Sequence, residues 1–204
     1  MKAVVFVEGG DRGELRIQMR RAFRELFAKA GVKAEFRPCG GRKLAYNSFC
    51  IAQKNPFADD EVYFLLIDSE DPIDEKIEES GDYWRHLKNR DNWDLPLGAV
   101  RNHLLLMVTC TESWIIADPG ALDIVFKRDI QKSALFSVSG IEKRGHTEVI
   151  DNLKHATRNC SARYGKGRHS PALIEALNPQ KLAKLSHWRR CVEILSDPVA
   201  ALAG

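Results

Sequence analysis

The sequence feature that most constrains the fold is a short, unbroken apolar run over residues 62–67, rich in β-branched and aromatic side chains. A run of this length predicts a strand that is buried on both faces, as in a parallel sheet covered by helices. Three carboxylates, Asp68, Glu70 and Asp71, follow directly. Open α/β sheets bind ligands outside the carboxyl ends of their strands, so these carboxylates are candidate ligands. A solvated acidic turn is the alternative interpretation.

The N-terminal part of the chain alternates between strand and helix patterns. Residues 3–7 form a second apolar run, which ends at Glu8 and two glycines that permit a tight turn. Residues 12–30 have helical periodicity, residues 33–37 alternate as a strand does, and residues 42–53 predict a helix. This order of β-α-β-α-β implies right-handed crossovers and a mainly parallel sheet.

The ends of the two apolar strands suggest a metal site. If the strands over 3–7 and 62–67 are neighbours, Glu8, Asp68 and Glu70 lie on the same rim of the sheet. Hard oxygen ligands with few histidines nearby favour Mg²⁺ or Mn²⁺ over zinc. A metal ion held there could polarise a phosphodiester and stabilise its leaving oxygen.

Composition and charge indicate a globular protein with an uneven charge distribution. Hydrophobic residues make up 44% of the 204 residues, and no apolar run is long enough to span a bilayer. We expect no signal peptide, because Met1-Lys2 leads directly into the apolar run over residues 3–7. The five cysteines are odd in number and contain no CxxC pair, which argues against a disulfide framework or a structural zinc site and predicts a cytoplasmic location. The net charge is +5 over residues 1–60, −7 over 61–99 and +5 over 100–204. A metal-dependent enzyme that acts on a polyanion would have this pattern, as would many solvated surfaces.

The middle of the chain continues the α/β pattern after a long polar segment. Residues 72–99 are either an insertion or a plain long crossover, and we favour the crossover. Residues 103–110 predict another buried strand, followed by Glu112. Glu112 could join the acidic rim as a further metal ligand, or stabilise the first turn of a helix through the macrodipole. Trp114 is expected in the core, and Asp118 with Pro119 is expected to cap the following helix.

The strongest basic cluster lies over residues 158–169 and is punctuated by glycines. A flexible backbone with basic and aromatic side chains suits phosphate contact and base stacking, although most basic loops are solvated surface. Residues 171–177 and 179–195 predict two closing helices. The candidate nucleic-acid-binding residues in the cluster are Arg158, Arg163, Tyr164, Lys166 and Arg168.

Several short motifs together resemble a known family. A strand ending in Glu-Gly, a helix, and a later strand ending in Asp-x-Asp is the Toprim pattern of topoisomerases, bacterial primases and OLD-type nucleases. VVFVEGG with LLIDSED looks like a Toprim core over residues 1–70. The segment LLLMVTCTESWIIADPGAL over residues 104–122, with Tyr164-Gly165-Lys166 downstream, is similar to markers of a small bacterial Toprim-like family. Its members often lie beside ABC- or SMC-type ATPase genes in anti-phage defence loci.

The resemblance implies a fold and roles for the rim residues. The fold would be a Toprim-like, Rossmann-like α/β core over residues 1–140 with a helical extension over 141–204. Glu8 would be a metal ligand or general acid/base, and Asp68 with Glu70 would hold the metal. Glu70 replaces the second aspartate of Asp-x-Asp, so Asp71 could be the second ligand instead.

The resemblance also implies a function. We expect a Mg²⁺- or Mn²⁺-dependent nuclease that cleaves DNA or RNA, tRNA included, with Glu8, Asp68, Glu70 and Lys166 as its catalytic residues. It would be the toxic effector of an anti-phage defence system, held in check by an ABC- or SMC-type ATPase partner. Homo-oligomer formation stays open. The alternative is a non-catalytic Toprim-like subunit that docks onto the ATPase.

Overall fold

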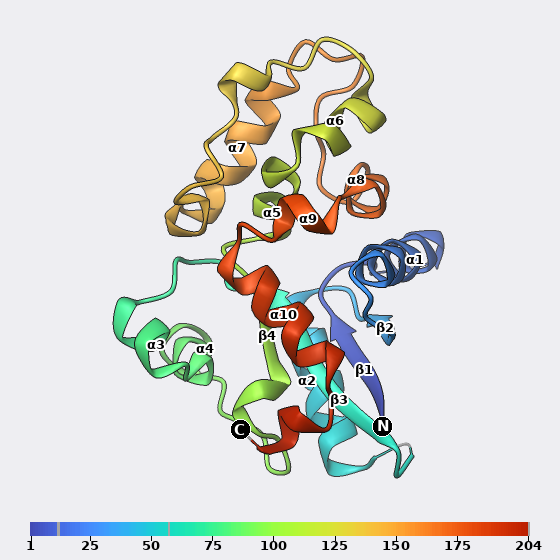
Figure 1. Ribbon diagram of the computed structural model, residues 1–204, viewed down its shortest axis with the longest axis vertical. Helices are drawn as coiled ribbons and strands as arrows, with labels where there is room; N and C mark the ends of the chain where they lie inside the picture. The colour runs from blue at the N-terminus through green and yellow to red at the C-terminus, as the bar shows by residue number, and fades with distance from the viewer. Residues whose placement is uncertain (12, 57, 204) are drawn as a thin grey trace.

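The fold is built on one parallel sheet, seen in a computed structural model that describes residues 1–11, 13–56 and 58–203 (Figure 1). Four strands lie in the order β2-β1-β3-β4, and every neighbouring pair is parallel. The predicted mixed α/β fold with a parallel sheet flanked by helices is therefore confirmed. The strands are β1 (Lys2–Val7), β2 (Ala34–Pro38), β3 (Glu61–Asp68) and β4 (Leu104–Met107).

The apolar run of β3 is buried on both faces, as its composition predicts. Phe64 and Leu66 pack on one side of the sheet, while Leu65 and Ile67 pack on the other. Strands β1 and β3 are direct neighbours, with Val5 opposite Phe64. Their carboxyl ends therefore lie side by side, as the position of the acidic rim requires.

Helices cover both faces of the sheet. One face carries α1 (Gly13–Lys29) and α10 (Ser186–Ser196), and the other carries α2 (Arg42–Lys54), α3 (Glu75–Ser80) and α4 (Tyr83–Asp91). Position 12, where the sequence predicts the start of α1, lies outside the described residues. In Figure 1 the remaining helices gather beyond the carboxyl ends of the strands. They are α5 (Thr111–Ala117), α6 (Pro119–Phe126), α7 (His146–Ala156), α8 (Ser170–Ala176) and α9 (Pro179–Leu182).

Residues 72–99 form a crossover with two helices. Asp74 caps α3 by accepting a hydrogen bond from the backbone N–H of Lys76 at 2.9 Å. In α4, Trp84 and Leu87 are buried against the sheet. The composition of residues 89–98 predicts turns, but this prediction is wrong for the first three positions, because α4 extends through Asp91. The favoured interpretation, a crossover, fits this packing.

The C-terminal part contains two helices where the pattern over 179–195 predicts one. That prediction is wrong because the carboxylate of Glu142 caps the second helix at its start. Glu142 accepts hydrogen bonds from the backbone N–H groups of Ser186 and His187 and from the Ser186 hydroxyl. These bonds satisfy donors that a continuous helix would use internally. The chain thus divides into α9 and α10.

Helix α10 closes the open edge of β4. The backbone carbonyl of Met107 accepts from the Ser69 N–H on the β3 side. The carbonyl of Leu104 faces the other way and accepts from Nη1 of Arg190 at 2.8 Å. The Cys191 thiol lies 4.0 Å from the Leu106 carbonyl oxygen. Side chains of α10 therefore replace the strand that is missing at this edge.

An aromatic cluster joins the N-terminal and C-terminal parts of the chain. Trp114, predicted to be a core residue, is 0% exposed. The ring of Trp188 lies 4.9 Å from the rings of both Trp114 and Phe27. The core is thus continuous across residue 140, and the boundary between a core over 1–140 and an extension over 141–204 stays a prediction. Within the described ranges, none of the helices has the length and apolar character needed to cross a membrane.

Candidate metal and catalytic site

Carboxylates that lie at or just after the ends of three neighbouring strands meet at one end of the sheet. Glu8 follows β1, Asp68 ends β3, and Glu112 lies in the first turn of α5, which begins soon after β4. Oε2 of Glu8 accepts a hydrogen bond from the backbone N–H of Asp68 at 3.3 Å. A pocket of about 220 Å³ lies here, and Glu8, Asp68, Thr111 and Lys166 are among its lining residues. The predicted acidic rim is therefore present, and both interpretations of Glu112 agree with its position.

The pocket wall beside Glu8 is a glycine loop. Gly9 and Gly10 have φ values of +110° and +66°, a backbone region that residues other than glycine rarely adopt. A Cβ atom on Gly10 would lie 3.0 Å from the Cα of Arg16 in α1. The glycines thus allow α1 to pack closely behind the end of β1.

Asp68 is buried and fully hydrogen-bonded. Its side chain is 1% exposed, and Oδ1 accepts from the backbone N–H and the hydroxyl of Thr111 at 2.8 and 3.0 Å. Oδ2 accepts from Nζ of Lys166 at 3.0 Å. The same Nζ lies 3.9 Å from Oε2 of Glu112. Although burial acts in the opposite direction, these two carboxylates raise the pKa of Lys166 above its ordinary value, so Lys166 is a cation in the pocket.

Glu8 has the most unusual protonation in the pocket. Burial, followed by the charge of Asp68, raises the pKa of Glu8 from 4.5 to about 8, although the charge of Lys166 acts in the opposite direction. Glu8 therefore retains a proton near neutral pH. A carboxyl group with this pKa can donate or accept a proton at physiological pH.

Glu112 and Tyr164 form a buried pair. Glu112 is 0% exposed, and its Oε1 accepts from the Tyr164 hydroxyl at 2.6 Å. Tyr164 is 3% exposed, and its hydroxyl also lies 3.0 Å from the Ser170 hydroxyl. The prediction that Tyr164 stacks on a base is therefore wrong for this structure, because the ring is enclosed. Its role here is to hold Glu112.

The two other candidate ligands after β3 point in different directions. Glu70 has a φ of 70°, and its Oε2 lies 2.9 Å from Nδ1 of His146, the first residue of α7. Asp71 has a side chain that is 63% exposed and pairs with Nε of Arg90 at 2.8 Å. The structure thus brings Glu70 toward the site and turns Asp71 toward solvent.

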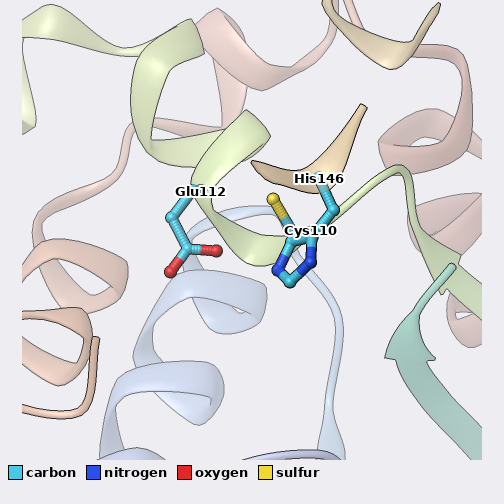
Figure 2. A group of neighbouring side chains, drawn as sticks. All are labelled: Cys110, Glu112 and His146. Carbon is cyan, nitrogen blue, oxygen red and sulfur yellow. The ribbon is translucent and has the colours of Figure 1, made fainter. Parts of the chain in front are cut away.

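Two groups of side chains at the site could hold a metal ion. In each group the candidate ligand atoms all lie within 4.8 Å of one another. The first consists of Asp68, Glu70 and His146, and the second of Cys110, Glu112 and His146 (Figure 2). His146 belongs to both groups, and it is a histidine that the sequence did not link to the carboxylates. The chain therefore has acidic, histidine and cysteine groups that could bind a metal.

Most of the predicted basic cluster lies away from the pocket. Nη1 of Arg158 lies 2.8 Å from Nδ1 of His155, and Nε of Arg163 donates to the Lys154 carbonyl at 3.2 Å. Arg168 is exposed and lines a separate hollow beside α1, α6 and α8. Lys166 and the neighbouring Gly167 are the members of the cluster that line the pocket.

Sequence comparison gives the chain a family. Residues 8–193 match the family described as a domain of unknown function, DUF4276. The chain belongs to this family. The matched DUF4276 segment contains Glu8, Asp68, Glu112, His146 and Lys166. Comparisons of this DUF4276 chain with curated proteins and with solved structures found no match.

Proposed function

We propose that this chain is a metal-dependent nuclease that hydrolyses phosphodiester bonds of DNA or RNA. The observation that carries the proposal is the convergence of Glu8, Asp68 and Lys166 on one pocket at the carboxyl ends of β1 and β3. The pocket combines carboxylates that can hold a cation with a lysine that can hold a phosphate.

The carboxylates fit a hard divalent cation. Asp68 and Glu70 offer oxygen atoms close to one another and to a nitrogen of His146, and Glu8 is adjacent to Asp68. Mg²⁺ and Mn²⁺ prefer such oxygen donors, and Mn²⁺ also accepts imidazole. The ion would supply charge stabilisation and an activated water molecule. Asp68 and Glu70 are the residues that we assign to hold it, while Glu8 serves proton transfer.

Lys166 and Glu8 have separate roles in the proposed reaction. The Lys166 side chain is 47% exposed, so its ammonium group can exchange Asp68 for a phosphate oxygen and stabilise the charge that develops there. Glu8 holds a proton near neutral pH. It is therefore placed to act as a general acid toward the leaving oxygen.

The resemblance to Toprim nucleases adds a biological role to the proposal. Glu8 and Asp68 end adjacent parallel strands, which is the placement that the Toprim pattern requires. By that resemblance the chain would be the toxic effector of an anti-phage defence system, restrained by an ABC- or SMC-type ATPase.

One observation favours a second candidate, a non-catalytic subunit that docks onto the ATPase. Both oxygens of Asp68 already accept hydrogen bonds, from Thr111 and from Lys166. A carboxylate saturated in this way can serve stability alone, because a buried charge that is paired and hydrogen-bonded needs no metal.

A cleavage assay distinguishes the two candidates. Mixed DNA and tRNA substrates are incubated with Mg²⁺, Mn²⁺ or EDTA, using wild type, Glu8→Gln and Lys166→Met. We expect metal-dependent cleavage that falls about 10²- to 10⁴-fold in Glu8→Gln and about 10²- to 10³-fold in Lys166→Met. Asp71→Asn is the matched control, because Asp71 is turned to solvent. Folded wild-type protein that cleaves neither substrate, with or without the ATPase, would support the non-catalytic subunit.

A further inference from the structure

We propose that Cys110, Glu112 and His146 form a second metal site, which lies beside the carboxylate site above and is suited to Zn²⁺. The three side chains come from the residue that precedes α5, from α5 itself and from the start of α7. Figure 2 shows the Glu112 carboxylate and the His146 ring facing each other beside the Cys110 side chain, and the sulfur, oxygen and nitrogen atoms of the group lie within 4.8 Å of one another.

The donor set selects the metal. Zn²⁺ is bound by cysteine sulfur, histidine nitrogen and carboxylate oxygen, whereas Mg²⁺ and Ca²⁺ take oxygen ligands. Bond lengths of about 2.0–2.3 Å place the ligand atoms of a tetrahedral zinc roughly 3.5 Å apart. Side-chain shifts of about 1 Å would close the group around the ion. Three protein ligands leave a fourth position for water or another small ligand, as in zinc sites that do chemistry.

Two buried polar atoms in this group lack hydrogen-bond partners among the described residues. They are Oε2 of Glu112 and Nε2 of His146. Glu112 is 0% exposed, and a buried carboxylate oxygen that accepts no hydrogen bond is costly. Lys166 has its Nζ 3.9 Å from this oxygen, beyond hydrogen-bond distance. A metal ion bound between Cys110, Glu112 and His146 would satisfy both atoms.

Neighbouring side chains already orient two of the three ligands. Oε2 of Glu70 lies 2.9 Å from Nδ1 of His146, which leaves Nε2 of the ring as the metal-binding nitrogen. A carboxylate behind a metal-binding histidine fixes the ring and its tautomer. Tyr164 holds Oε1 of Glu112 in the same way, at 2.6 Å. Glu70 is thus a positioning residue for this site.

Binding of Zn²⁺ at this site releases a proton from Cys110. The ligand is the thiolate, so the Cys110 S–H bond breaks, an S–Zn bond forms, and the proton leaves to solvent. No sequence pattern indicates this site, since Cys110 and His146 are 36 positions apart with no metal-binding spacing between them. The fold brings them together by placing the start of α7 beside the loop after β4.

Cobalt titration of the full chain tests the site. Protein treated with a chelator and kept reduced is titrated with Co²⁺, followed by competition with Zn²⁺. We expect the thiolate-to-Co²⁺ charge-transfer absorption that follows from a sulfur ligand, and this absorption should saturate at about one Co²⁺ per chain. Cys110→Ser should abolish the absorption, and Cys50→Ser, which alters a cysteine on α2, should keep it. Glu70→Gln should keep the absorption and weaken Zn²⁺ binding about 10- to 100-fold.

The result that overturns the proposal does not depend on a variant that may unfold. X-ray absorption at the zinc edge of the wild-type protein should show one sulfur neighbour, and a shell of nitrogen and oxygen alone would refute the site. Retention of the charge-transfer absorption in Cys110→Ser, with unchanged circular dichroism, would refute it too. Nuclease activity is not a readout here, so a chain that cleaves nothing but binds Co²⁺ through sulfur would contradict only the proposed function.

Discussion

Replacing Glu8 by glutamine should remove a loss of folding stability that the wild-type protein shows as pH rises. Glu8 has a pKa of about 8 in the folded protein against 4.5 ordinarily, because burial and then the charge of Asp68 favour the neutral form. Below pH 4.5 the carboxyl group is protonated in both the folded and the unfolded chain, so it does not lower the free energy of unfolding. Between pH 4.5 and 8 the unfolded chain loses the proton and the folded chain keeps it. Stability therefore falls as pH rises through this interval and stays low above it.

The size of the effect follows from the interval. Each pH unit in this interval lowers the free energy of unfolding by up to about 1.4 kcal/mol. The span from pH 5 to pH 8 therefore lowers it by about 4 kcal/mol at most. The Glu8 side chain is only partly buried, and solvent screens part of the interaction. We expect roughly 2 to 4 kcal/mol. Glutamine has nearly the shape of the protonated acid and cannot ionise, so Glu8→Gln should gain this much relative to wild type between pH 5 and pH 8.

Urea unfolding at a series of pH values, with EDTA present, measures the difference. Subtracting the two curves removes the contribution of every other titrating group. A stability difference between Glu8→Gln and wild type that stays constant from pH 5 to pH 8 would refute the assigned environment of Glu8.

Three further substitutions test the packing around the site, each by urea unfolding. Trp188→Ala should cost about 3–5 kcal/mol, because the ring is 2% exposed; a loss under 1 kcal/mol would contradict the aromatic cluster. Tyr164→Phe should cost about 1–3 kcal/mol, since Glu112 loses its hydroxyl donor, and no loss would mean that the pair is not formed. Asp118→Ala should cost about 2–3 kcal/mol, because its carboxylate accepts from the N–H groups of Gly120 and Asn178; an unchanged midpoint would argue against both bonds.

The strands and the acidic rim could be predicted because their causes are local. The apolar runs that form β1 and β3 are short, and carboxylates come directly after each. Parallel strands end on the same side of a sheet, so Glu8 and Asp68 had to meet once the two strands were neighbours. The same logic placed Glu112 after β4.

The rest of the site depends on contacts between distant segments. His146 starts a helix that packs beyond the sheet, and no spacing in the sequence links it to Glu70 or Cys110. A weak signal was available, since a glycine precedes His146 and a glutamate follows at the third helical position, which marks a helix start. Tyr164 lies in a basic segment that suggested a surface loop, yet its hydroxyl satisfies a buried carboxylate. Only the tertiary structure reveals that the buried Glu112 carboxylate needs this hydrogen-bond donor.

The edge of β4 has a consequence for how the chain is made. The carbonyls of Leu104 and Leu106 are covered by Arg190 and Cys191, which lie more than 80 residues later in the chain. At about 5–20 residues per second of synthesis, the edge stays uncovered for roughly 5–20 s. An open strand edge can pair with another chain during that time. A chain terminated before residue 186 would keep its edge open permanently, so we expect truncated products to aggregate and to need chaperones or proteases for their removal.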